Sequence, residues 1–436
     1  MDGENSVKQL LSKHILADGF DFVMDFEKSH GCWIHDRKTG REFLDMFSMF
    51  ASASVGYNHP YILGKSEWLG KMAVNKPTLA DVYSDEYATF MEVFSRIAMP
   101  EPLQYAFFIS GGTLAVENAM KACFDWKTRK NFEKGMDKEA GVCIHFKQAF
   151  HGRSGYTLSL TNTADPRKYM FYPKFDWPRI TNPKLKFPVT EKSLSKTMRK
   201  EQMALLQIQE AILSNPDEVA CIIIEPIQAE GGDNHFRDEF FVELRKLCDE
   251  NEVLLIFDEV QTGIGLTGKM WAFQHFSIVP DIISFGKKSQ VCGVLASKSK
   301  FDEIPNNVFR ESSRINSTFG GNFIDMLRFQ LILEVIEQEN LIENAEIQGR
   351  YLLSQLQKLQ QRFPEKISNA RGRGLMCAFD LENSDKRDRL RNILYDDGLI
   401  ILGCGKKSIR FRPHLTVSEQ EIDRALELVE AGLSKL

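Results

Sequence analysis

The sequence predicts an α/β fold in which a large domain holds a mostly parallel central sheet and a smaller domain is α+β. Three observations support this prediction. Short β-rich runs alternate with helical patterns from about residue 106 to residue 297, as in parallel strands joined by helices. The pattern changes after residue 320, where long helices dominate. Finally, a chain of 436 residues is longer than one small hydrophobic core usually requires.

Five apolar runs predict the strands of the large domain. Each run is almost continuously apolar, which is typical of strands that helices cover on both faces. The runs are VCIHF at 142–146, ACIII at 220–224, VLLIF at 253–257, DIISF at 281–285 and GVLAS at 293–297. Between them, residues 114–126 and 236–251 repeat apolar side chains every three or four positions and predict amphipathic helices. The proline-rich segment 161–188 is expected to be an ordered surface excursion, because both of its neighbours belong to the α/β pattern.

The C-terminal part of the chain predicts a compact α+β domain. Ser418 and Glu421 form the pattern of a capping box before the last helix. The other elements expected here are helices at 323–341 and about 346–362 and strands at 375–381, 399–402 and 408–412. We predict three parts: an N-terminal segment 1–55 that packs with the small domain, a large domain 56–322 and a small domain 323–436.

Composition excludes several functional classes. The net charge of -5 provides no basic patch for nucleic acid or anionic membranes. No apolar stretch of about 18 residues could span a bilayer. The first twenty residues lack the pattern of a signal peptide. The eight cysteines form no CxxC pair and predict buried thiols of a reducing cytoplasm, and the nine histidines show no spacing typical of a metal site. We therefore expect a cytoplasmic protein without a metal.

Three charged residues stand where predicted strands end. Glu225 follows 220–224, Asp258 follows 253–257, and Lys287 comes two residues after 281–285. In open α/β sheets, ligands bind outside the carboxyl ends of the strands, so these side chains are expected to converge on one crevice. The ordinary alternative for each of them is a charged residue that leaves a strand for solvent.

The chemistry of two of these residues points to one cofactor. Asp258 directly follows an apolar strand and needs a cationic partner, which a protonated ring nitrogen would provide. A lysine becomes a nucleophile when burial and nearby positive charge keep its amine partly neutral. Pyridoxal 5'-phosphate requires both an aspartate and a lysine of this kind. Lys287 is the expected nucleophile, and Lys288 is the alternative, which on a solvent-facing turn would be a surface lysine.

A phosphate-binding segment is also present. The sequence SGGT at 110–113 lies directly before the predicted helix 114–126, and its glycines allow the backbone to close around an anion at the positive end of that helix. Glycines before a helix are also common turn residues, so this motif gains weight only beside Asp258 and Lys287.

Two longer segments carry a resemblance to a known family. LLIFDEVQTGIGLTGKMWAF and PDIISFGKKSQVCG resemble the signature of the class III aminotransferases, fold type I enzymes that use pyridoxal phosphate. From about residue 56 to the C-terminus, further segments, among them FHGR, QAEGGD, NSTFGGN and SIRFRP, resemble the members that act on the terminal amino group of L-lysine.

The resemblance implies roles for the cofactor-binding residues. Lys287, which follows the small residue Gly286, would form the Schiff base, and Asp258 would hold the pyridinium nitrogen. The other implied contacts are Gln261 with the phenolic oxygen, Val260 and Phe150 with the ring faces, Gly112 and Thr113 with the phosphate, and Thr318 with the phosphate from the other subunit. The resemblance thus implies a homodimer with shared active sites.

It also implies the substrate-binding residues. Arg153 matches an arginine that binds the substrate carboxylate, Arg410 matches the one for the α-carboxylate of 2-oxoglutarate, and Asn316 is expected to contact substrate. Arg412 competes with Arg410 because alternate residues of a strand share a face. Glu230 would neutralise Arg410 while the amino donor is bound and move away when the 2-oxo acid arrives.

The implied reaction is transfer of the 6-amino group of L-lysine to 2-oxoglutarate. Its products would be L-glutamate and 2-aminoadipate 6-semialdehyde, which cyclises to 1-piperideine-6-carboxylate. Two alternatives remain at this point: 4-aminobutyrate or ornithine as the amino donor, and an inactive homologue that binds pyridoxal phosphate without catalysis.

Overall fold

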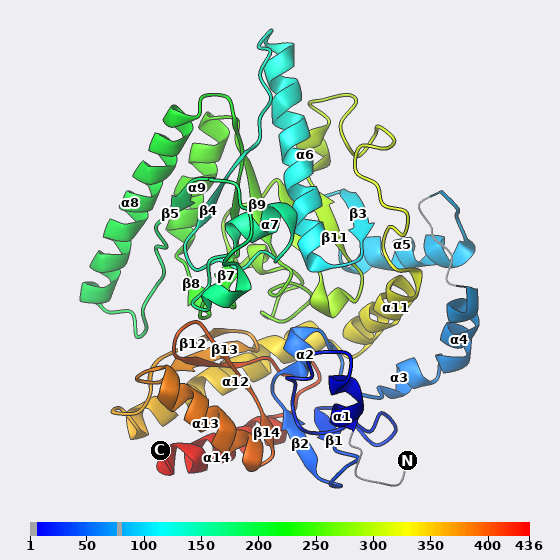
Figure 1. Cartoon of the computed structure of the whole chain (residues 1–436), viewed down its shortest axis with the longest axis vertical. Coiled ribbons are helices and arrows are strands. Elements are labelled where there is room, and N and C mark those ends of the chain that lie inside the picture. The colour runs from blue at the N-terminus through cyan, green and yellow to red at the C-terminus, as the bar shows by residue number, and fades with distance from the viewer. Residues whose placement is uncertain (1–6, 76–80) are drawn as a thin grey trace.

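The structure of the chain, a computed structural model, describes residues 7–75 and 81–436. Figure 1 shows a larger body built on a central sheet and a smaller body that contains both the N-terminal and the C-terminal segments. The central sheet has the strand order β3-β11-β10-β9-β6-β4-β5. Its strands are β3 (Tyr105–Ile109), β4 (Val142–Phe146), β5 (Arg179–Ile180), β6 (Val219–Ile224), β9 (Leu254–Asp258), β10 (Ile282–Phe285) and β11 (Cys292–Ala296).

The central sheet is mostly parallel, as predicted. Strands β10, β9, β6, β4 and β5 pair in parallel, whereas β11 runs antiparallel to both of its neighbours, β10 and β3. The connection from β10 to β11 explains this exception, because residues 286–291 are too few for the crossover that a parallel pair requires. Each of the five apolar runs lies within one residue of an observed strand.

Helices cover the central sheet. The predicted helix 114–126 is part of the longer α6 (Gly112–Glu133), which packs against β6, β10 and β11, and the predicted helix 236–251 is α9 (Asp238–Glu250). A long helix between them, α8 (Glu191–Ser214), was not predicted. The other elements of this body are α5 (Asp85–Ile97), α7 (Gly155–Leu160), η1 (Pro166–Lys168), β7 (Ile227–Gln228), β8 (Asn234–His235), η2 (Ala272–His275), η3 (Lys287–Ser289) and α10 (Lys298–Phe301).

The smaller body joins the two ends of the chain. Strand β2 (Glu42–Asp45) pairs with β1 (Trp33–His35) and with β14 (Leu399–Ile400), so N-terminal and C-terminal residues share a sheet. A second sheet contains β12 (Ser368–Arg373), β13 (Met376–Asp380), β16 (Ser408–Phe411) and β15 (Leu402–Cys404). The helices of the N-terminal and C-terminal parts of the chain are α1 (Val7–Ser12), α2 (Ser48–Ala51), α3 (Pro60–Leu63), α4 (Ser66–Asn75), α11 (Phe323–Gln338), α12 (Leu341–Arg362), α13 (Ser384–Asp396) and α14 (Glu419–Ser434).

Two local predictions in this body can be compared with the structure. The capping box is present, because the Glu421 amide donates to Ser418 Oγ and the Ser418 amide donates to Glu421 Oε2 at 2.8 Å. The predicted helix 323–341 is too long. It ends at Gln338 because Asn340 adopts a left-handed conformation, with φ of 53°, and α12 starts after it.

All eight cysteines are free and buried, as expected from their apolar surroundings. Among the helices that the structure describes, none has the length and apolar character needed to cross a membrane.

We expect substitution of Gly349 by alanine to destabilise the smaller body. A Cβ atom at this position of α12 would lie 2.1 Å from the carbonyl carbon of Gly374, in the turn between β12 and β13. Overpacking of this kind costs about 1–3 kcal/mol, so the midpoint of thermal unfolding should fall by about 1–3 °C for a chain of this length. Gly70→Ala in α4 is the control, because a Cβ atom there meets nothing within 4 Å. Equal midpoints for the two variants would contradict this expectation.

Candidate active site

A cavity of about 190 Å³ lies at the carboxyl ends of β6, β9 and β10. Its position confirms the expectation that Glu225, Asp258 and Lys287 converge at one edge of the sheet. The residues that line it are Gly112, Thr113, Phe150, His151, Gly152, Glu225, Glu230, Asp258, Val260, Gln261, Thr262 and Lys287. They include every residue that the sequence assigned to the cofactor within one subunit.

Lys287 enters the cavity from the turn after β10. It adopts a left-handed conformation, with φ of 56°, and its side chain is half-buried. Burial lowers the pKa of the Lys287 amine, and the positive charge of Arg410 lowers it further. A side chain on Gly286 would place a Cβ atom 2.8 Å from Cys292 Sγ, which explains the small residue before the lysine. The amine thus gains the neutral fraction that a nucleophile needs.

Lys288 is not a surface lysine, contrary to expectation. Only 1% of it is exposed, and its Nζ donates to the carbonyl of Ala51 at 3.0 Å. Burial lowers the pKa of Lys288 well below its usual value, and Arg412 adds to the shift. The turn is covered because Ser54 donates to the Lys288 carbonyl at 2.7 Å. Lys288 is therefore committed to packing and does not line the cavity.

Asp258, the last residue of β9, is held by three donors. Its Oδ1 accepts from the Val260 amide and from Ser284 Oγ, both at 3.1 Å. Its Oδ2 lies 2.7 Å from Nδ1 of His151, a buried histidine whose Nε2 has no hydrogen-bond partner in the part of the chain that the structure describes. His151 was missed by sequence reasoning, and its only signal was its place directly after Phe150.

Glu225 has a structural position in the cavity wall. It accepts from the amides of Phe150 at 3.0 Å and Ala229 at 3.1 Å and thereby fixes both loops. The carboxyl group is buried, and burial raises its pKa to about 7.

This raised pKa predicts a pH dependence of stability. The unfolded chain holds Glu225 at its usual pKa of 4.5, so between pH 4.5 and about 7 the folded state binds more protons. The contribution of Glu225 to the free energy of unfolding is therefore greatest below pH 4.5. It falls by at most about 3 kcal/mol as the pH rises towards 7. Glu225→Gln should flatten this part of the curve of unfolding free energy against pH. Glu210→Gln, at an exposed carboxylate of α8, is the control and should leave the curve unchanged.

The part of the cavity wall at the start of α6 fits a phosphate group. Helix α6 begins at Gly112, and the amides of its first turn have no intrahelical acceptors. A Cβ atom on Gly112 would lie 2.9 Å from Val260, and one on Gly152 would lie 1.9 Å from Thr113 Oγ1. Glycine at these positions therefore leaves backbone donors accessible beside Val260. These backbone donors match the phosphate of pyridoxal phosphate. The Asp258 carboxylate matches its ring nitrogen, and the Lys287 amine matches its aldehyde.

The structure distinguishes the two competing arginines. Arg412 is buried and fully paired: it donates to Asp233 at 2.9 Å and to Gln261 Oε1 at 3.1 Å. Arg410 is also buried, and its Nη1 lies 3.0 Å from Glu230 Oε2. Its Nε and Nη1 make no hydrogen bond of good geometry within the described residues. Arg410 is therefore the arginine with donors left for a ligand.

Other predicted residues lie outside this cavity. Arg153 is exposed, and its Nε donates to the carbonyl of Lys168 at 3.3 Å. Asn316 and Thr318 are exposed in the segment before α11. Asn316 borders a different cavity of about 310 Å³. The structure does not bring these three side chains to Lys287 within one chain.

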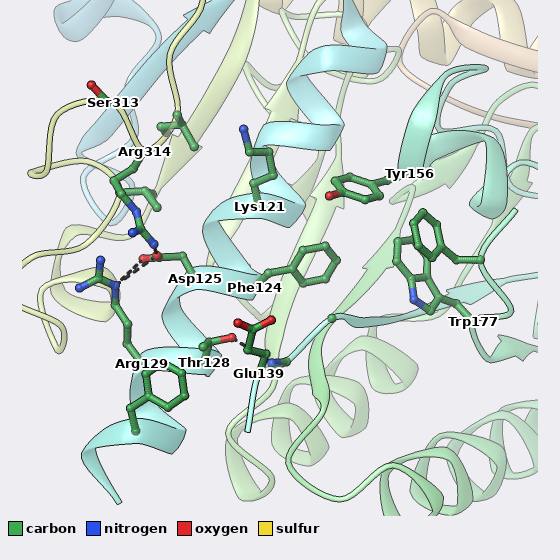
Figure 2. A pocket seen from close by; sticks show the side chains of 16 residues that line it. Lys121, Phe124, Asp125, Thr128, Arg129, Glu139, Tyr156, Trp177, Ser313 and Arg314 are labelled. Carbon is green, nitrogen blue, oxygen red and sulfur yellow. Dashed lines mark hydrogen bonds and ion pairs between the residues drawn. The ribbon is translucent and has the colours of Figure 1, made fainter. Parts of the chain in front are cut away.

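The largest cavity described, about 920 Å³, lies elsewhere and holds none of the predicted residues. Figure 2 shows Asp125 of α6 between Arg129 and Arg314, with Trp177 across the cavity. Asp125 is paired with both arginines, and none of the charged residues that line this cavity stands at the carboxyl end of a central strand. This cavity lacks the constellation that the smaller one contains.

Several known proteins are similar to this chain over nearly its whole length. Residues 16–433 match the family model Aminotransferase class-III. The L-lysine-epsilon aminotransferase of Mycobacterium tuberculosis is 48% identical over 98% of this chain and 95% of its own length, and that of Streptomyces clavuligerus is 44% identical over 98% and 94%. A solved lysine aminotransferase from M. tuberculosis in the internal aldimine form superposes with a TM-score of 0.96, at 48% identity over 98% of both chains.

More distant relatives act on another amine. The 4-aminobutyrate aminotransferase of Kluyveromyces lactis is 32% identical over 95% of this chain and 91% of its own length. These similarities and the cavity with its lysine, aspartate and phosphate-binding helix lead to one conclusion. The chain belongs to the class III aminotransferases, fold type I enzymes that use pyridoxal phosphate.

Proposed function

We propose that this aminotransferase transfers the 6-amino group of L-lysine to 2-oxoglutarate. The products are L-glutamate and 2-aminoadipate 6-semialdehyde, which cyclises to 1-piperideine-6-carboxylate. The observation that carries the choice of donor is the 44–48% identity to curated L-lysine-epsilon aminotransferases over nearly the whole chain. The relatives named for 4-aminobutyrate are only 32–33% identical.

The residues of the cavity support this chemistry. When bound, pyridoxal phosphate supplies an aldehyde that captures amines and a ring that withdraws electrons. Lys287 would hold the aldehyde between turnovers, and its Nζ would move a proton at the amine-bearing carbon of the substrate. Asp258, oriented by His151 and Ser284, would keep the ring nitrogen protonated. Gln261, whose amide oxygen accepts from Arg412, can offer its NH₂ group to the phenolic oxygen.

Glu230 and Arg410 support the use of two dissimilar substrates. The terminal carbon of lysine carries no carboxylate, so Glu230 can remain paired with Arg410 while this donor reacts. 2-Oxoglutarate carries a carboxylate beside its reacting carbon, and the planar guanidinium of Arg410 can bind it once Glu230 moves away.

The donor is tested by single-turnover reactions of the purified holoenzyme. L-Lysine, L-ornithine and 4-aminobutyrate are mixed with it separately, and the visible absorbance of the bound cofactor is followed. We expect fast loss of absorbance with L-lysine and a product that 2-aminobenzaldehyde traps. Preferential reaction with 4-aminobutyrate would refute the donor and leave the family unchanged.

We also infer a homodimer in which Thr318 contacts the phosphate in the partner's site. Its exposure and that of Asn316 support this inference, as do the exposed aromatic side chains of Tyr83 and Phe319, which are 80% and 65% exposed. Light scattering coupled to size exclusion should give twice the mass of one chain. The domain boundaries at 55 and 322 and a cytoplasmic location remain predictions.

A further inference from the structure

Glu230 binds two cations, one with each carboxylate oxygen. Its Oε2 lies 3.0 Å from Nη1 of Arg410, and its Oε1 pairs with Nζ of Lys168. Lys168 comes from η1, in the proline-rich segment 161–188, and its ammonium also lies 5.7 Å from the ring centre of Phe150. The Glu230 side chain is only 23% exposed, so both pairings are only partly screened by solvent.

Glu230 also stands between two cavities. It lines the cavity that contains Lys287, and with Lys168 and Arg410 it lines a second cavity of about 770 Å³. The second cavity is rich in basic side chains. They are Arg167, Lys168, Arg387, Arg391, Lys406, Lys407 and Arg410, against Asp165, Glu230 and Glu382. A cavity of this charge favours the approach of a dicarboxylate.

We propose that Lys168 is a positioning residue for the acceptor half of the reaction: it retains Glu230 when the carboxylate of the 2-oxo acid takes Arg410. This inference rests on the proposed function of Arg410. When Glu230 separates from Arg410, its mostly buried carboxylate loses one cationic partner, and this loss costs free energy. The bond to Lys168 lowers this cost because it uses the other oxygen. A donor such as lysine requires no separation, so Lys168 favours acceptor binding selectively.

The test uses Lys168→Met in the holoenzyme, with glutarate as an unreactive dicarboxylate. We expect the dissociation constant of glutarate, measured by calorimetry, to rise at least about tenfold, as for loss of one charge-assisted hydrogen bond. The apparent affinity for the amino donor should change less than about twofold, because methionine keeps the apolar stem. Lys168→Arg should restore most of the glutarate affinity. Thermal unfolding of each variant verifies that the fold is intact.

Lys406→Met is the matched control. It removes the same charge from the same cavity, and its side chain makes no hydrogen bond or ion pair with Glu230 in the described structure. An equal loss of glutarate affinity in both variants would mean that the positive charge of the whole cavity attracts glutarate, and it would overturn the proposal. Equal weakening of donor and acceptor in Lys168→Met, unchanged glutarate binding, or no binding of glutarate by the wild type would overturn it too.

The donor assignment can fail separately. Glutarate binding does not depend on which amine reacts. If the wild type does not react with L-lysine but Lys168→Met still lowers the affinity for glutarate, only the assignment of lysine as the donor is refuted. In that case, the donor affinity is measured with whichever amine the wild type converts fastest.

Discussion

Replacement of Lys287 by alanine is expected to slow transamination by a factor of at least about 10³. Lys287 is the only lysine that lines the 190 Å³ cavity within the described residues, and burial and Arg410 lower the pKa of its amine. In the proposed function, the variant loses both the covalent holder of the cofactor and the base that moves the proton. Acid–base catalysis alone contributes about 10²- to 10⁴-fold. Single-turnover absorbance changes with L-lysine measure the loss.

A second measurement distinguishes Lys287 from its neighbour. Reduction of the wild-type holoenzyme with borohydride should fix the cofactor on Lys287, which mass spectrometry of the peptides can locate. Lys288→Met should still be labelled at Lys287, because Lys288 does not line the cavity and its Nζ donates to the Ala51 carbonyl. Label on Lys288 in the wild type would assign the covalent role to the other lysine.

Strand ends were predictable because they depend on local sequence. A continuous apolar run defines a buried strand, and the polar residue at its end must lie at the edge of the sheet. Asp258 and Lys287 were found in this way, and the five predicted strands of the large domain agree with the structure to within one residue. The predicted strand 399–402 is instead divided between β14 and β15, which belong to different sheets. Helix α8 escaped prediction even though Thr190 and Ser193 form a capping box at its start.

The residues that sequence reasoning missed are not marked by local sequence. His151, Asp233 and Lys168 act through partners that are distant in sequence: His151 and Asp258 are 107 residues apart, and Asp233 and Arg412 are 179 apart. Nothing local marks such a pair. The error at Lys288 has the same origin, because the carbonyl that it contacts belongs to Ala51, 237 residues away. A single turn does not reveal which segment covers it.

The second large effect separates Arg410 from Arg412. Arg410→Met should raise the dissociation constant of glutarate at least about 100-fold, since a buried guanidinium paired with a carboxylate contributes several kcal/mol. Its stability should change little, because Glu230 keeps Lys168 as a partner. Calorimetry and denaturant unfolding of the same preparation measure the two quantities.

Arg412→Met should show the reverse pattern. Asp233 is 0% exposed and would lose its guanidinium partner, so the free energy of unfolding should fall by about 3–5 kcal/mol. Glutarate affinity, measured where the variant remains folded, should fall far less than in Arg410→Met, because the Arg412 guanidinium is already occupied by Asp233 and Gln261. A large loss of glutarate affinity in Arg412→Met with intact stability would transfer the acceptor site to Arg412. Arg410 lies in β16 and Arg412 follows directly after that strand, so their different expected roles follow from their partners: Asp233 is fully buried, whereas Glu230 has Lys168 as a second cation when Arg410 separates from it.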